Sequence, residues 1–190
     1  MWIRYLNVPI LAVAICGLLH PRGAAQDKLA RDRALPLIEK LHVENVDVRR
    51  GTANQLRMLD RNAQREALPA LIERLDKEKD GQVRLAVLDT LTSLGTDAVS
   101  AVPALVHTLE TDVGGRGSEA SHQDYRAALA LAAIGKPAVD GLLGLLKARK
   151  ESVRAEAAMA LGRIGPDAAA AAPDLILMLA DKSERTRREA

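Results

Sequence analysis

A helical segment recurs along this chain, and the recurrence constrains the fold more than any other feature. Copies begin at residues 48, 83, 123, 153 and 186, and the last copy stops at Ala190. The copy at 83 has apolar residues three or four positions apart, at Val83, Val87, Leu91 and Leu94. This is the spacing of one face of a helix, so each copy is predicted to be helical.

A second motif lies between these copies and predicts a partner helix for each of them. Its clear examples are 67–75, 101–109 and 171–179, and its weaker ones are 34–41 and 138–146. Proline at 69, 103 and 173 is tolerated near the start of a helix or at a kink, so we expect each first helix to begin or bend there. Glycine follows the second helix at 95, 135 and 165, where a left-handed residue is needed to end the helix and a side chain would clash.

Each repeat is therefore a predicted pair of helices, which cannot bury its apolar face alone. Stacked pairs would form an all-α protein, an α-α superhelix with one continuous core. We expect residues 26–190 to hold about four full repeats and a truncated fifth, with 26–33 as a helical cap or linker. Solenoids usually end in a repeat with a polar outer face, so the break at Ala190 predicts a fragment of a longer chain or a truncated reading frame.

The repeats resemble HEAT repeats, and more closely the HEAT-like repeats named after phycobilisome lyases. Those units have the form Val-Arg-x-x-Ala followed by Leu and Ile-Gly, a form seen best in residues 153–165, and the likeness extends over about 34–190. The resemblance implies stacked hairpins and is compatible with scaffolding, enzyme regulation and cofactor-related roles. One branch, the deoxyhypusine hydroxylases, binds iron through His-Glu pairs, and this sequence contains no His-Glu dipeptide.

Residues 1–25 have the features of a secretory signal peptide. Arg4 precedes the apolar run 8–19, and the small residues 23–25 place a predicted cleavage after Ala25. The apolar run is shorter than the roughly 20 residues that span a bilayer as a helix. We therefore expect an exported protein, periplasmic or extracellular, with no membrane span after removal of the signal.

Composition and motifs argue against catalysis and against nucleic-acid binding. Aromatic residues make up 2% of the chain and Phe is absent, which excludes recognition by aromatic stacking. The only cysteine, Cys16, lies in the signal segment, and none of His42, His107 and His122 has another His three or four residues away. We expect no enzyme activity, no cofactor and no metal site. Residues 1–25 hold two arginines and no acid, so the remaining chain has equal numbers of basic and acidic residues.

A glycine-rich insertion at 112–122 lengthens the third repeat, and we place it, with His122, in a loop. Its Gly115-x-Gly117-x-x-Ala120 spacing is that of a dinucleotide-binding fingerprint, but no candidate strand precedes it. One hypothesis is that Arg116 and nearby backbone amides contact a partner or an anion. The alternative is a disordered insertion, which is tolerated because loop closure costs little.

Arginine recurs at the second position of the second helix, as Arg49, Arg84, Arg154 and Arg187, whereas the degenerate copy has Gln123-Asp124 there. An acidic residue closely precedes each arginine: Asp47, Asp80, Glu151 and Glu184. We expect ion pairs within or between repeats to neutralise the row. Phosphate binding would need clustered cations that remain available.

The sequence thus predicts an exported, non-catalytic scaffold that binds a protein partner. The alternative is a regulatory or lyase-like subunit or domain of a larger enzyme. The stacked second helices are expected to line a concave surface. The candidate partner-binding residues are Arg50, Asn54, Arg57, Asp89, Thr92, Arg116 and Glu156.

Overall fold

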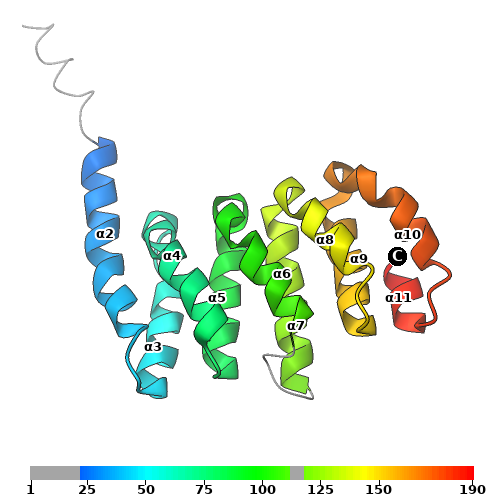
Figure 1. Cartoon of the computed structure of the whole chain (residues 1–190). Helices are drawn as coiled ribbons and strands as arrows, with labels where there is room; N and C mark the ends of the chain where they lie inside the picture. Colours follow the sequence, from blue (N-terminus) through cyan, green and yellow to red (C-terminus); the bar gives the residue numbers. More distant parts are fainter. Residues whose placement is uncertain (1–21, 112–117) are drawn as a thin grey trace, which may run out of the picture.

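The computed structural model describes residues 22–111 and 118–190, which form two rows of helices (Figure 1). The first-helix row contains α2 (Arg22–Lys40), α4 (Arg61–Lys77), α6 (Val102–Glu110), α8 (Val139–Leu145) and α10 (Ala172–Met178). The second-helix row contains α3 (Val46–Arg57), α5 (Gly81–Leu94), α7 (Ser118–Ile134), α9 (Glu151–Ile164) and α11 (Glu184–Glu189). Short 3-10 helices, η1 (Gly95–Ala101), η2 (Lys136–Ala138) and η3 (Gly165–Ala171), lead into α6, α8 and α10. The predicted all-α fold is confirmed.

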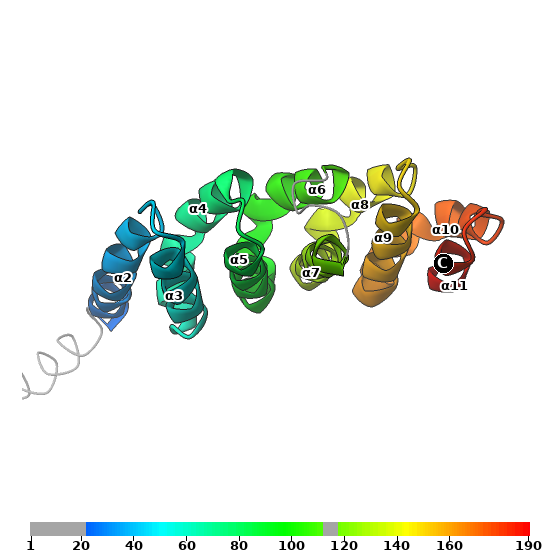
Figure 2. The same ribbon diagram turned by 90° about the horizontal axis from the view of Figure 1, so that it is seen from below.

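The two rows stack into a bowed array in which each repeat touches its neighbours. Each second helix packs against the second helix of the next repeat, from α3 through α11. Figure 2 shows the first helices along one side of the array and the second helices along the other, on the inner side of the bow. The second helices therefore form the concave face.

Side-chain caps explain where most of the second helices begin. The side chains of Asn45, Asp80 and Ser183 accept hydrogen bonds from backbone N–H groups in the first turns of α3, α5 and α11, which satisfies donors that the helix leaves free. Lys150 occupies this place ahead of α9 and provides no side-chain cap. Capping side chains thus fix where α3, α5 and α11 begin, whereas α9 begins without a side-chain cap.

The glycine prediction is confirmed in its essential part. Gly95, Gly135 and Gly165 have φ values of 54°, 82° and 70°, which side chains disfavour. Their ψ values of −125°, −141° and −135° place them in a region close to mirror-image β structure rather than in the left-handed helical region. Each glycine therefore ends one helix and starts the 3-10 turn that leads into the next first helix.

At two of the three proline positions the first helix begins there; at the third, Pro69, the predicted alternative of a bend stays a prediction. Pro103 and Pro173 lie in the first turns of α6 and α10, where the missing N–H has no helical partner in any case. Pro69 lies inside α4, so this helix does not begin at its proline. The earlier start follows from Asp60, whose carboxylate caps α4 at the N–H of Ala63, 3.1 Å away.

One continuous core of buried Leu, Val, Ile and Ala side chains runs from Leu41 to Met178, as the stacking argument predicts. Small residues allow close helix packing at α8, where a Cβ added to Gly141 would lie 2.8 Å from Cγ2 of Val106. A smaller buried cluster of Ala30, Ala34 and Ala63 joins α2 to α4. The predicted signal segment falls largely on residues 1–21, outside the described residues, and residues 22–25 belong to α2.

One described stretch, Gly81–Glu110, is long and apolar enough to cross a membrane, with a mean hydropathy of 1.2. It comprises α5, η1 and α6 and is interrupted at Gly95. Leu88, Leu91 and Leu105 are fully buried in the stack. The stretch therefore has the character of core helices.

Candidate functional site

Three of the predicted partner-binding residues lie together on α3. Arg50, Asn54 and Arg57 are exposed, and their spacing of four and three residues places them on one face of the helix. The Asn54 side-chain amide donates to the backbone oxygen of Arg50 at 3.1 Å. These residues form the polar start of the concave face.

A polar groove continues from α3 to α5 and α7. It encloses about 210 Å³ and is lined by Asn54, Arg57, Gln82, Leu85, Ala86, Asp89 and Arg126. Arg126 contacts the Asp89 carboxylate, with 3.0 Å between Nη1 and Oδ1. Asp89 is thus brought beside Asn54 and Arg57, as the sequence predicts, but its charge is already compensated by a residue that the sequence did not single out.

An apolar hollow follows on the same row of helices. It encloses about 340 Å³ and is lined by Thr92, Leu129, Ala132, Ala133 and Arg163, from α5, α7 and α9. The Thr92 hydroxyl donates to the backbone oxygen of Leu88 at 2.8 Å, so its hydrogen is already used within α5. Arg163 forms no ion pair within the described residues, and it lies at the hollow with its Nε 3.1 Å from Sδ of Met159.

The expectation that Glu156 is an accessible side chain is wrong. Its side chain is 4% exposed and pairs with Arg185 of α11. Burial raises the pKa of Glu156 above its ordinary value, against the opposing effect of Arg185. The following repeat covers this part of α9, and Glu156 therefore belongs to an inter-repeat contact. Arg116 lies outside the described residues.

Arg49, Arg154 and Arg187 hold the loop before their own second helix. Each arginine donates hydrogen bonds from Nη1 to two backbone oxygens, those of the residues six and five positions earlier. The two distances are 3.0 and 2.5 Å for Arg49, 2.9 and 3.1 Å for Arg154, and 2.7 and 3.2 Å for Arg187. Loop carbonyls would otherwise lack partners. This local role explains why arginine recurs at one helix position.

Two of the arginines also reach an acidic residue of the following repeat. Arg49 binds Glu78 through Nε and Nη2, at 2.8 and 3.0 Å, and Arg154 binds Asp181 at 2.8 Å through both nitrogens. These two-point contacts are strong charge-assisted hydrogen bonds. The ion pairs between repeats are confirmed, but the acids are not the predicted Asp47, Asp80, Glu151 and Glu184.

The pKa values of the two acids reflect this pairing. Burial alone would raise the pKa of Glu78, but hydrogen bonds from Arg49 and from the Asp80 backbone hold it below its ordinary value. The Arg154 guanidinium and the Ser183 backbone N–H hold the pKa of Asp181 to about 2. Both carboxylates therefore stay charged at neutral pH.

Sequence reasoning missed Glu78 and Asp181, although a usable signal was present. Each lies six residues before Arg84 or Arg187, just ahead of the side chain that caps the second helix. An acid at this loop position faces the preceding repeat.

The two central positions of the arginine row, 84 and 124, differ from the outer positions 49, 154 and 187. Arg84 is 1% exposed and donates to Oε1 of Gln123 at 2.8 Å and to the backbone oxygen of Leu75. Burial lowers its pKa from the ordinary value. At the next position Asp124 replaces arginine, and Lys150 of the following repeat approaches it, with 3.0 Å from Nζ to Oδ2. The charge order is therefore reversed at this contact.

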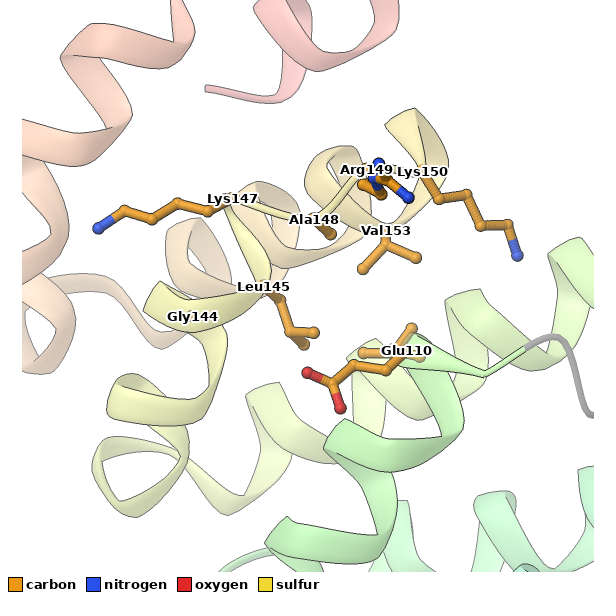
Figure 3. A pocket seen from close by; sticks show the side chains of 9 residues that line it. Glu110, Gly144, Leu145, Lys147, Ala148, Arg149, Lys150 and Val153 are labelled. Atoms are coloured by element: carbon orange, nitrogen blue, oxygen red, sulfur yellow. The ribbon is translucent and has the colours of Figure 1, made fainter.

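A further pocket of about 440 Å³ lies between the end of α6 and the turn from α8 to α9. Lys147, Arg149 and Lys150 border it together with Glu110. In Figure 3 the two lysine side chains extend in opposite directions, away from the pocket. The cations do not converge on a common point, so they form no anion site of the kind expected for phosphate.

The histidines do not assemble into a reactive cluster. His42, His107 and His122 are exposed, and His122 lies in α7 rather than in the predicted loop, because this helix already begins at Ser118. Over residues 22–111 and 118–190, no group of three or more His, Cys, Asp or Glu could hold a metal ion.

The HEAT-repeat family profile matches this sequence over residues 34–122 and 116–190. The chain belongs to the HEAT repeat family. A search of curated proteins found no match. Among solved structures, a crystal structure of an engineered protein from a structural genomics consortium is similar, with 20% identity, a TM-score of 0.49, and coverage of 81% of this chain and 74% of that one.

Proposed function

We propose that the chain is an exported, non-catalytic scaffold that holds a protein partner on its concave face. HEAT repeats generally mediate protein binding, which supports the general role. The observation that carries the location is the pairing of the polar groove with the apolar hollow on one row of helices. Interfaces combine an apolar centre with a polar rim, and these two features supply both.

The charges along the groove and the hollow, Arg57 in the first and Arg163 at the second, favour a partner that carries acidic residues beside an aliphatic side chain. Arg57 and Arg163 form no ion pair within the part of the chain that the structure describes, and both are exposed. Leu129 and the neighbouring alanines offer apolar area between them. An aliphatic side chain in the hollow, with carboxylates beside the arginines, would match this surface.

Site-specific photo-crosslinking tests the location. A photoreactive residue at Leu129 should capture a partner from the exporting compartment, and one at Val99, an exposed position in η1, should not. The variants Leu129→Asp and Arg57→Glu should weaken binding of the captured protein. Equal capture at Val99, or binding unchanged by both substitutions, would contradict the proposal.

Export is proposed from the features of residues 1–25 and has its own test. Expression of the full chain should yield a product that begins at Gln26, as read by N-terminal sequencing of the exported fraction. A product that retains Met1 in the cytoplasm would refute export and leave the binding proposal standing.

A further inference from the structure

The residues that line the polar groove and the apolar hollow carry a surplus of positive charge. Among the described residues, the lining side chains include three arginines, Arg57, Arg126 and Arg163, and a single acid, Asp89. Asp89 is matched by Arg126, with 3.0 Å between their charged groups and side chains that are 28% and 47% exposed. Arg57 and Arg163 are exposed and form no ion pair with a described residue. Two positive charges of this surface therefore remain for a partner to compensate.

The groove and the hollow are two parts of one surface, called here the concave strip and defined by the residues that line them. Asp89 of the groove and Thr92 of the hollow lie one turn apart on α5, and Arg126 of the groove and Leu129 of the hollow lie one turn apart on α7. A ligand that leaves the groove therefore enters the hollow directly.

The two uncompensated arginines stand at opposite ends of the concave strip. Arg57 is on α3 and Arg163 on α9, and the second helices between them touch in the order α3, α5, α7, α9 (Figure 1). Packed helices lie about 8–10 Å apart, so three steps separate the two arginines by about 24–30 Å. An extended peptide advances about 3.3 Å per residue and covers this span in about seven to nine residues.

The hollow beside Arg163 disfavours a partner that is charged throughout. Leu129, Ala132 and Ala133 line this hollow. A polyanion would place charged groups over these apolar side chains, where a charge without a partner is costly. A peptide with few carboxylates, and with an aliphatic residue next to one of them, places each group against its complement.

The polar side chains of the concave strip favour an extended segment over a helix. The Asn54 amide nitrogen and the Thr92 hydroxyl donate within their own helices, so the side-chain oxygens are what they offer to a ligand, as acceptors. An extended segment brings backbone N–H groups that need acceptors, whereas a helix has bonded most of its own. A helix is also about 10–12 Å wide, and the groove encloses only about 210 Å³.

We propose, building on the partner-binding role of the concave face, that the concave strip holds an extended peptide segment with two carboxylates about eight residues apart. One carboxylate pairs with Arg57 and the other with Arg163. An aliphatic side chain next to the second carboxylate enters the hollow and contacts Leu129.

Fluorescence anisotropy with labelled synthetic peptides and the full chain, produced through its export route, tests the spacing. The probe peptide is rich in serine and threonine and carries two aspartates about eight positions apart, with a leucine next to one of them. A second peptide of the same composition has its aspartates half as far apart and cannot reach both arginines. The probe peptide should bind about five-fold more tightly, which is the effect of one exposed ion pair of about 1 kcal/mol.

Charge-reversed variants test the two ends of the concave strip. Arg57→Glu and Arg163→Glu should each weaken binding of the probe peptide. A peptide with lysine in place of the aspartate beside the leucine should regain binding to Arg163→Glu. Arg149→Glu is the matched control, because Arg149 is exposed, forms no ion pair within the described part of the chain and borders a different pocket. This control makes the same change of charge and should bind the probe peptide like the unaltered chain.

Three results would overturn the proposal: equal affinity for both aspartate spacings, tighter binding of a helical peptide with carboxylates about 18 residues apart, or no binding of the probe peptide up to about 1 mM. If photo-crosslinking at Leu129 still captured a partner, the scaffold role would stand without this ligand class. Spacing-dependent binding of the probe peptide without a captured partner would support the ligand class and count against the scaffold role.

Discussion

The contact between the first two repeats and the contact between the third and fourth repeats place their charges in opposite order. In the first, the cation Arg49 stands on the second helix and the acid Glu78 comes from the next repeat. In the other, the acid Asp124 stands on the helix and the cation Lys150 comes from the next repeat. In both contacts the anion is the more buried partner, at 1% and 7% exposure.

The difference teaches that at these two contacts a buried anion is compensated whether its cation stands on the second helix or in the loop of the next repeat. The reversal also has a cost, because Lys150 occupies the place from which Asp80 caps α5 and gives α9 no side-chain cap. A missing cap costs about 1 kcal/mol of helix stability. The two contacts are therefore electrostatically alike but differ in what holds the helix start.

Glu78→Ala should cause the largest loss, about 3–5 kcal/mol in the free energy of unfolding, because a buried ion pair loses one partner. Glu78 serves both Arg49 and Arg74, with Oε2 at 2.8 and 3.3 Å from their Nε atoms. Urea denaturation measures the change. Glu73→Ala, which removes an exposed acid paired with Lys77, is the control. A loss no larger than that of the control would show that the contact is not needed.

Exchanging the charges of the reversed contact should have an intermediate effect. Asp124→Arg and Lys150→Asp are each expected to cost about 1–3 kcal/mol, because each places like charges together at a partly buried site. The double variant should recover most of this loss and gain a cap for α9. A double-mutant cycle gives the coupling free energy. Additive losses would refute the view that these two residues replace the Arg–acid pair.

Stability should respond to pH in opposite directions at two neighbouring carboxyl groups. The pKa of Asp181 is lowered from 3.8 to about 2, so its contribution is present above about pH 4 and lost as pH falls toward 2. The pKa of Glu156 is raised from 4.5. Its contribution to the stability of the folded state is therefore present below pH 4.5 and is lost as pH rises through the raised pKa.

Thermal unfolding between pH 2 and 7 separates the two groups. Asp181→Asn should be less stable than the unaltered chain at neutral pH, and this difference in stability should shrink as pH falls below 4. The stability of Glu156→Gln should rise relative to that of the unaltered chain as pH increases above 4.5. Curves that run parallel to that of the unaltered protein would contradict both assignments.

The smallest effect is expected for Arg50→Ala. Arg50 binds Asp80 at 3.0 and 2.6 Å, but its side chain is 44% exposed, and exposed pairs contribute about 1 kcal/mol or less. Arg49→Ala, one residue earlier, should cost clearly more in the same denaturation experiment, because it removes the contacts to Glu78 and to the loop carbonyls. Equal losses would mean that burial does not separate the two arginines.

Much of the fold could be predicted because it depends on local patterns. The apolar spacing at Val83, Val87 and Leu91 gives α5, and Gly95 ends it with positive φ. The same reasoning correctly placed Arg50, Asn54 and Arg57 on one exposed face.

The remainder depends on how loops place one repeat against the next. Arg49 meets Glu78 across 29 positions of sequence, and the nearer acid Asp47 instead approaches Arg50. Glu156 is buried because Arg185 of the next repeat lies over it. Helical periodicity specifies a face but not the neighbour that covers it, so these contacts required the structure.

The reversed contact between Asp124 and Lys150 also bears on the order in which identical-looking hairpins find each other during folding. If α7 were to dock against the last repeat, Ser183 would stand in the place of Lys150, so the Asp124 carboxylate would lack its cation and Lys150 would lose its acid. Such a misplaced pairing is penalised while the correct neighbour is rewarded. In a chain of similar units, one exchanged pair of charges thus marks the centre of the array and discourages hairpins from skipping a neighbour.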